Sequence, residues 1–116
     1  MLTDLVDRGL LDETLVVIAS DMRRTPRVGD ALSPSGRNHW NFCQTVLCAG
    51  GGVRGGQLFG SSDKIAAYPT DNPVRPEHVA ATMYEALGIS ENLWATDALG
   101  QPYHLLEEGH PLPLFG

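Results

Sequence analysis

The sequence has few cationic residues, only two cysteines and no long apolar run. Eight Lys and Arg residues stand against fourteen Asp and Glu residues, so the net charge is −6. Binding to nucleic acid without sequence preference depends on cations that neutralise phosphates, and this charge balance therefore predicts no nucleic-acid partner. No apolar run approaches the roughly eighteen residues that a membrane span needs, so we expect no transmembrane segment.

The two cysteines, Cys43 and Cys48, form no recognisable framework. They lie five positions apart in a stretch that reads as a strand, so their side chains should point to opposite faces. Two cysteines also lack the ligand spacing of a structural zinc site. We expect two free thiols, with Cys48 in the core, and this pair identifies no cellular compartment.

The length and the apolar segments of the sequence predict a single domain of the α/β class that spans residues 1–116. This length suits a single domain with a core of its own. Two continuous apolar runs, Leu15–Ala19 and Thr45–Ala49, are typical of strands buried on both faces. A long loop rather than a tight turn separates them, so we expect neighbouring parallel strands in a mostly parallel sheet covered by helices.

Two helices are expected beside these strands. Thr3–Arg8 can begin at a capping threonine and stop at the following glycine. The clearer helix is Pro76–Leu87, because proline suits the first helical position and Gly88 can end it. The apolar face that should pack on the sheet consists of Val79, Ala80, Met83 and Leu87. Two weaker elements are also predicted, a hairpin arm at Gln57–Gly60 and a short strand at Tyr103–Leu106.

The stretch Ser20–Asn41 breaks the apolar pattern and reads as a long loop after the first strand. Ligands of open α/β sheets bind beyond the carboxyl ends of strands, and long loops are commonly functional. Asp21 follows the strand, and His39 lies eighteen residues later. A carboxylate and a neutral imidazole can bind one divalent ion, which could polarise a phosphoryl or sulfuryl oxygen. By spacing alone the signal is weak, and a solvated loop in which Asp21 caps a turn is the better interpretation.

Arg24 and Arg37 flank these two residues. Their guanidinium groups match tetrahedral oxyanions, although pairing with nearby carboxylates is the more common role. The glycine-rich Ala49–Gly56 lacks the Lys-Ser/Thr ending of a phosphate-binding loop, so a tight reversal after a strand is the better interpretation. Trp40 could wall a pocket but more often anchors a loop, and Asp63 and Asp71 are weaker candidates for extra ligands. His78 is expected to be exposed, and His104 and His110 lie in the irregular tail without identifiable partners.

Several segments are more informative in their order along the chain than one by one. They are Gly9–Val17, Arg24–Arg27, Gly36–Trp40, Ala49–Gly56, Tyr68–Pro69, Asp71–Pro73, Pro76–Glu77, Ala86–Ile89 and Leu99–Pro102. This order resembles a bacterial sulfatase-like family of unknown function in the alkaline-phosphatase superfamily, over nearly the whole chain. The resemblance implies the C-terminal portion of a large α/β sandwich. It also implies a divalent metal (Zn, Ca or Mg) on Asp21 and His39, with Arg24 and Arg37 binding a sulfate or phosphate ester.

This sequence departs from the pattern of that superfamily at several positions. Met22 follows Asp21 where superfamily members have a His, and Asn38 precedes His39 where an Asp is expected. The superfamily's nucleophile comes from an earlier part of the chain, and no serine here has a neighbouring base. We therefore expect a C-terminal fragment that carries part of a metal site, is inactive alone and self-associates through an unpaired sheet edge. The alternative is a non-catalytic binding or assembly module on the same α/β scaffold.

Overall fold

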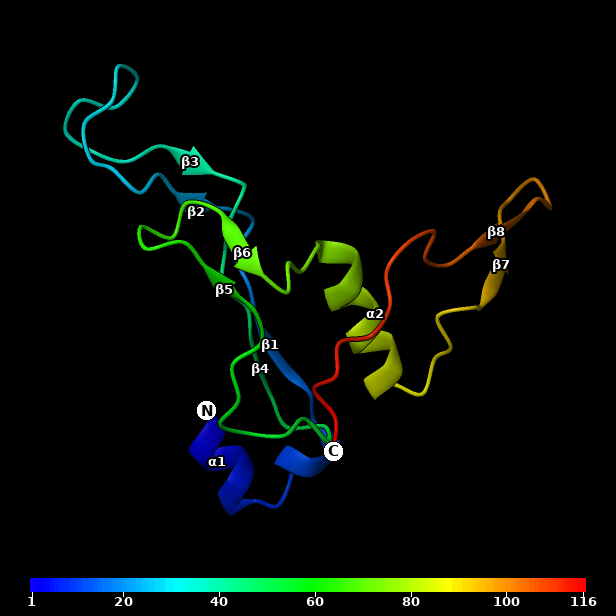
Figure 1. The fold of residues 1–116 in the computed structure, drawn as a ribbon. Coiled ribbons are helices and arrows are strands. Elements are labelled where there is room, and N and C mark those ends of the chain that lie inside the picture. Colours follow the sequence, from blue (N-terminus) through cyan, green and yellow to red (C-terminus); the bar gives the residue numbers. More distant parts are fainter. The chain divides into compact units, whose positions relative to one another are not determined.

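The computed structural model describes all residues, 1–116, and consists of short helices and strands joined by long connections (Figure 1). The helices are α1 (Leu2–Asp7), the 3-10 turn η1 (Leu11–Glu13) and α2 (Pro76–Ala86). The strands are β1 (Val16–Ile18), β2 (Arg23–Arg24), β3 (His39–Trp40), β4 (Leu47–Ala49), β5 (Ser61–Ser62), β6 (Pro69–Asp71), β7 (Trp94–Thr96) and β8 (Pro102–His104). Both expected helices and both apolar strands are therefore present, within a few residues of their predicted bounds.

The expected fold class, a mostly parallel sheet covered by helices, is wrong. The strands form four separate two-stranded sheets, β1–β4, β2–β3, β5–β6 and β7–β8. The last three pairs are antiparallel. The apolar runs are also not buried on both faces, since Ile18 of β1 and Leu47 of β4 are exposed. A continuous apolar run indicates a strand, but it does not determine how many strands pair beside it.

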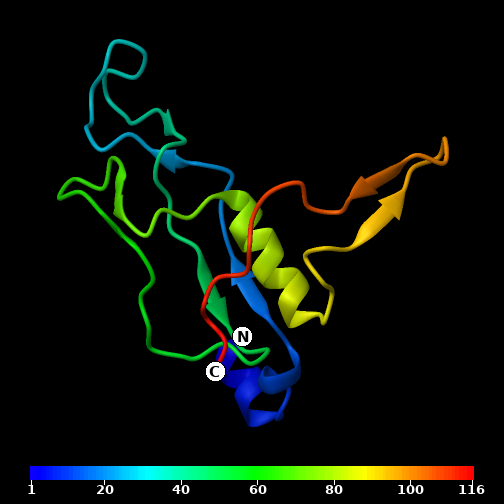
Figure 2. The same cartoon turned by 45° about the vertical axis from the view of Figure 1, so that its right-hand side comes forward.

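β1 and β4 pair with each other, as expected, but they run in opposite directions. The Gly51 N–H donates to the carbonyl oxygen of Leu11 at 2.9 Å. A side-chain carbon at Gly50 would meet the carbonyl oxygens of Leu11 and Thr14. Because Gly50 follows β4 and Thr14 precedes β1, the end of one strand lies beside the beginning of the other (Figure 2). The long connection thus joins antiparallel strands, for which a tight hairpin is not required.

The glycine-rich segment after β4 is the tight reversal predicted from the sequence. Gly50, Gly51 and Gly52 all have positive φ, at 75°, 58° and 86°. The Val53 N–H closes the turn by donating to the Gly50 carbonyl at 3.0 Å. Three successive residues in this region of φ are costly for any side chain, so the reversal depends on glycine.

The chain divides into two compact units. Unit 1 comprises residues 1–15, 49–55 and 74–116, and unit 2 comprises residues 16–48 and 56–73. Unit 1 has three arginines against ten Asp and Glu residues, whereas unit 2 has five Lys and Arg residues against four Asp residues. The net charge of −6 thus separates into −7 on unit 1 and +1 on unit 2. The excess of negative charge therefore lies in unit 1, whereas unit 2 is nearly neutral.

In unit 1, α2 packs against the C-terminal tail. Thr82 is 2% exposed, and Ala81 and Leu114 are also buried. The Thr82 hydroxyl donates to the His78 carbonyl at 2.7 Å and accepts the Leu112 N–H at 2.9 Å. One hydroxyl thus satisfies a buried amide of the tail and fixes the tail to the helix.

The apolar face predicted for this helix is not the buried one. Met83 and Leu87 are exposed, Leu87 by 71%. The buried positions are Ala81 and Thr82, where the tail lies close to the helix. The helical spacing correctly predicted a helix. The C-terminal tail packs against this helix, whereas a sheet was expected to do so.

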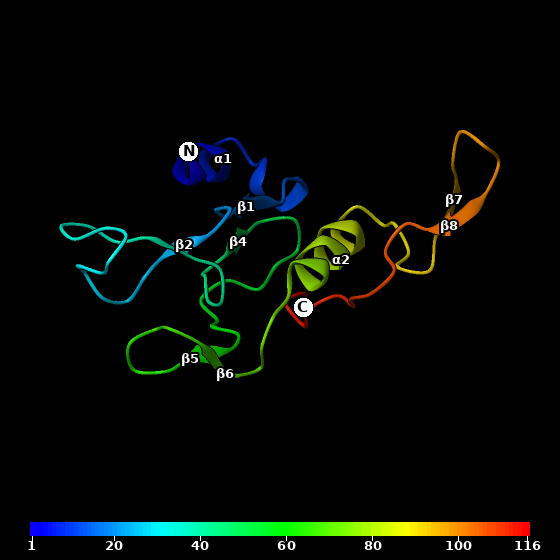
Figure 3. The same ribbon diagram turned by 90° about the horizontal axis from the view of Figure 1, so that it is seen from above.

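The remaining strand predictions had mixed outcomes. The strand expected at Tyr103–Leu106 is present as β8, which pairs with β7 (Figure 3). The hairpin arm expected at Gln57–Gly60 is wrong, because pairing begins only at β5. No helix of the structure is both long and apolar enough to span a membrane.

Candidate functional site

The predicted site residues lie on or next to the β2–β3 hairpin of unit 2. Arg23 is paired with Trp40 and Arg24 with His39. The Thr25 N–H donates to the Asn38 carbonyl at 2.8 Å and extends the pairing by one residue. The sequence predicted a loop here, because two-residue strands with charged side chains give no β-branched or alternating run.

The hairpin has two different faces. Side chains directly opposite each other in an antiparallel pair point to the same side, and successive residues point to opposite sides. Arg24 and His39 therefore share one face, and both are exposed. Arg23 and Trp40 share the other face, and both are half-buried. We call Arg24, His39 and the adjoining Arg37 the cationic face.

The cationic face carries guanidinium charge that no carboxylate neutralises. An Nη1 of Arg24 donates to the Arg37 carbonyl at 3.3 Å, which links the two strands of the hairpin. None of the ion pairs in the structure includes Arg24 or Arg37. The expectation that these arginines pair with nearby carboxylates is therefore wrong, and the charge of Arg37 is open to an incoming anion.

The carboxylates of unit 2 are occupied by neutral donors instead. Asp30 Oδ1 accepts the N–H groups of Leu32 and Ser33 at 2.9 and 2.8 Å and the Asn38 side-chain amide at 2.6 Å. The Ser33 N–H, together with the Asn38 amide and the Leu32 N–H, holds the pKa of Asp30 below its usual value of 3.8. This aspartate stabilises the turn that leads into β3 and leaves the arginines unpaired.

Asp21 lies in the bend between β1 and β2. Its Oδ1 accepts the N–H of Met22 at 2.8 Å, which is the turn-capping role expected from the residues alone. No group of three or more His, Cys, Asp or Glu side chains is placed to hold a metal ion. Asp21 and His39 are only two ligands, whereas zinc sites take at least three from the protein. The residues do not form a complete metal site, and a metal on Asp21 and His39 stays a prediction.

On the opposite side of the hairpin, three rings form what we call the aromatic face. The ring centroids of Trp40 and Phe42 are 5.0 Å apart, and those of Tyr68 lie 5.5 and 5.4 Å from them. These separations are in the range preferred by interacting aromatic rings. Phe42 and Tyr68 are nevertheless 55% and 48% exposed. No local pattern predicts this cluster, because Tyr68 is remote in sequence from Trp40 and Phe42.

Hydrogen bonds to one turn hold the aromatic face in place. Trp40 Nε1 donates to the Ala67 carbonyl at 2.6 Å, and Arg23 donates to the Ala66 carbonyl at 2.7 Å. Asp63 shapes the same turn by accepting the Ala67 N–H at 2.7 Å. Trp40 thus anchors its loop, as expected, and the exposed rings of Phe42 and Tyr68 pack against this anchored ring.

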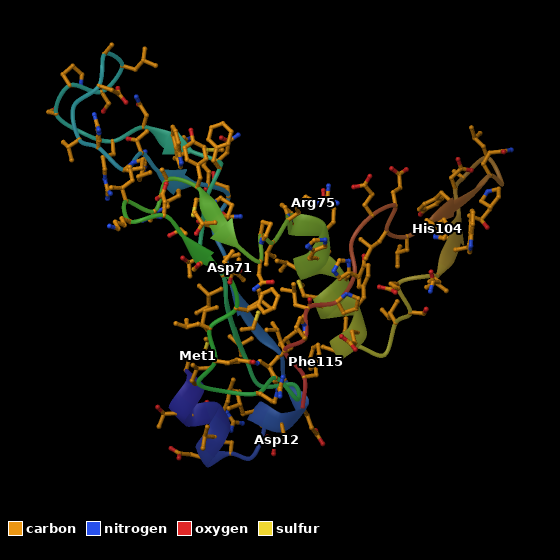
Figure 4. The ribbon with its side chains drawn as sticks, in the orientation of Figure 1. Met1, Asp12, Asp71, Arg75, His104 and Phe115 are labelled. Atoms are coloured by element: carbon orange, nitrogen blue, oxygen red, sulfur yellow. The ribbon has the colours of Figure 1, made fainter.

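The remaining side chains named in the sequence analysis are three histidines of unit 1 and Asp71, the last residue of β6. The ring centroids of His78 and His110 are 4.5 Å apart. Those of His104 and Trp94 are 3.9 Å apart with the rings tilted, and His104 lies on β8 (Figure 4). The side-chain amide of Asn72 donates to Asp71 at 3.0 Å. The contact of His104 is local to a hairpin and that of Asp71 to two neighbouring residues, whereas the contact of His78 with His110 joins α2 to the C-terminal tail.

Both cysteines are free thiols, as expected. Cys48 is half-buried rather than part of a core, and this burial raises the pKa of its thiol above the usual 9.0. A raised thiol pKa lowers the thiolate fraction near neutral pH, so Cys48 has the character of a packing residue.

Comparison with known proteins identifies a family without identifying an activity. Residues 1–114 match the family described as "Protein of unknown function (DUF1501)". Neither the search of curated proteins nor the search of solved structures gave a match. The resemblance to a sulfatase-like family of the alkaline-phosphatase superfamily is corrected by this result, since the match indicates no such superfamily. Because the match extends over nearly the whole chain, this protein belongs to the DUF1501 family.

Proposed function

We propose that the cationic face binds an oxyanion, the chemical group that sulfate and phosphate esters share. The observation that supports this proposal is the pairing of Arg24 with His39 on one exposed face, beside the unpaired Arg37. A guanidinium group is permanently charged and presents paired N–H donors that match two oxygens of a tetrahedral anion. The histidine adds a further donor on the same side of the hairpin.

The expected affinity is modest because the face is exposed to water. A hydrogen bond to a charged group contributes about 1.5–3 kcal/mol, and two such bonds correspond to a Kd on the order of 1 mM. The hairpin contributes by fixing the cations before the anion arrives, since Arg24 already donates to the Arg37 carbonyl. Such binding suits recognition of an anionic group on a larger ligand more than capture of a free ion.

Anion titrations followed by amide chemical shifts test the proposal. The anions are sulfate, phosphate and 4-nitrophenyl sulfate, with chloride keeping the ionic strength constant. We expect saturable shifts at Arg24, Arg37 and His39, and at least fivefold weaker binding for Arg24→Ala and Arg37→Ala. Lys64→Ala is the matched control, because Lys64 is an exposed cation of the same unit outside the hairpin. Equal losses in all three variants, or shifts that never saturate, would contradict a specific site.

The proposal concerns binding and includes no hydrolytic step. The Ser20 hydroxyl donates to the Met22 carbonyl at 3.2 Å, so it is not directed at a general base. Asp21 and His39 would be the ligands of a divalent metal if one bound, and such an ion could polarise an ester oxygen. The alternative function, a non-catalytic assembly module, is supported by a different observation, the exposed aromatic face.

A further inference from the structure

We infer that the aromatic face of one chain docks the β7–β8 hairpin of a second copy of the same chain. Trp40, Phe42 and Tyr68 are held against one another by their ring contacts and by the hydrogen bond from Trp40 to Ala67. A fixed aromatic surface loses little side-chain entropy on binding, and aromatic anchors are enriched in interface hot spots. The exposure of Phe42 and Tyr68 leaves two of these anchors free for a partner.

The charge beside the aromatic face indicates an acidic partner. Arg23 shares the face with Trp40, and the turn that anchors it carries Lys64 and one carboxylate, Asp63, so cations exceed anions there by one. Neither cation forms an ion pair with a carboxylate. Cations at the rim of an apolar patch favour association with a surface of negative charge and disfavour one of positive charge.

The β7–β8 hairpin has the complementary properties. It exposes Trp94, Tyr103 and Leu99, the last by 85%. Residues 94–104 of the hairpin include one carboxylate, Asp97, and no Lys or Arg, and the hairpin belongs to unit 1, whose net charge is −7. Both edges of this two-stranded sheet are also unpaired, since no third strand joins it. An apolar hairpin without cations, within the anionic unit, is thus the surface of this chain that best fits an aromatic face bordered by cations.

Such an interface is heterologous, because each copy contributes a different surface to it. One copy can therefore use its aromatic face while its own hairpin stays available to a third copy. The predicted result is concentration-dependent growth beyond a dimer, weakened by salt through the charged rim.

The experiment measures mass against concentration by analytical ultracentrifugation for the full chain and two single variants, Phe42→Ser and Leu99→Ser. We expect each variant alone to associate at least tenfold more weakly. An equimolar mixture should recover a discrete dimer, because one variant keeps the hairpin and the other keeps the aromatic face. Leu32→Ser is the control, since Leu32 is 88% exposed and outside both surfaces.

Several outcomes would overturn the inference. A chain that stays monomeric at all concentrations would exclude this contact between copies. If Phe42→Ser weakens association and Leu99→Ser does not, the aromatic faces pair with each other instead. If both variants dissociate and their mixture fails to form a dimer, the two surfaces do not meet. Circular dichroism and Trp fluorescence of each variant show whether it has kept its fold.

Discussion

The Leu112 N–H donates to the Thr82 hydroxyl at 2.9 Å and joins the C-terminal tail to α2. Thr82 is almost fully buried, and its hydroxyl also donates to the His78 carbonyl. A buried N–H group without a partner costs about 1–3 kcal/mol. The Thr82 oxygen is therefore one of the points that hold the tail, beside the Arg54 N–H, which donates to the Leu114 carbonyl at 2.8 Å.

Replacing that oxygen by a methyl group should loosen the tail. We expect Thr82→Val to lower the free energy of unfolding by about 1–3 kcal/mol, because the Leu112 N–H loses its acceptor while the side-chain shape is kept. Urea unfolding followed by circular dichroism measures the change. Thr96→Val, on the exposed face of β7, is the control and should change stability by less than about 0.5 kcal/mol. Equal effects would show that the buried hydroxyl is unimportant.

Two glycines with nearly the same φ should differ in their tolerance of alanine. Gly50 and Gly88 have φ of 75° and 72°, so a side chain at either position costs about 1–2 kcal/mol. A carbon added at Gly50 also meets the carbonyl oxygens of Leu11 and Thr14, whereas Gly88 has open space around it. Urea unfolding should therefore show a larger loss for Gly50→Ala than for Gly88→Ala. The reverse order would mean that the reversal after β4 is not packed against η1.

Acid should release the turn held by Asp30. Its pKa is lowered in the folded chain, so its stabilising contribution is present above the unfolded-state pKa near 3.8. That contribution is lost as the pH falls through the lower, folded-state pKa. The amide shifts of Leu32 and Ser33, followed from pH 6 to pH 2, should report a midpoint below 3.8. Asp30→Asn should abolish this titration, and a midpoint above 3.8 would contradict the hydrogen-bonded carboxylate.

Cys48 should react slowly with alkylating reagents. Burial raises its thiol pKa, so its thiolate fraction at pH 8 is smaller than that of an unstructured thiol. In a Cys43→Ser background, iodoacetamide should modify Cys48 more slowly than it modifies a short cysteine peptide. The difference should vanish in 6 M guanidinium chloride, where burial is lost. A native rate equal to that of the peptide would contradict this environment.

The chain should show no turnover of aryl sulfates or aryl phosphates. Ester hydrolysis of this kind needs an activated nucleophile, and Ser20 is directed at a carbonyl oxygen. The assay uses purified chain with Zn²⁺, Ca²⁺ or Mg²⁺, and compares it with buffer containing the metal alone. Metal-dependent turnover that disappears in Asp21→Ala would overturn this prediction and establish the metal site.

Local signals in the sequence predicted the elements better than their arrangement. Pro76 and Gly88 mark the ends of α2 because they act through their own backbone conformations. The apolar runs around β1 and β4 were likewise recognisable. Their direction was not, since it depends on Gly50 and Gly51 lying against η1, a contact that no local pattern encodes.

In the candidate site, too, the sequence predicted the residues but not their arrangement. Arg24, Arg37 and His39 were identified by residue type, and the structure adds that Arg24 and His39 face each other across a hairpin. The aromatic face was not predictable, because Tyr68 reaches Trp40 only through the fold. Pairing of the arginines with carboxylates was the reasonable expectation, and it failed because turn amides occupy the aspartates.

The antiparallel pairing of β1 with β4 affects how this chain can vary. The Gly51 backbone lies against Leu15, so the points where the chain leaves unit 1 and returns to it are adjacent. Residues 16–48 therefore form an insertion into unit 1 whose two ends lie next to each other. Such a segment can change length in its exposed loop while unit 1 keeps its own contacts, provided that Arg23 and Trp40 still reach Ala66 and Ala67.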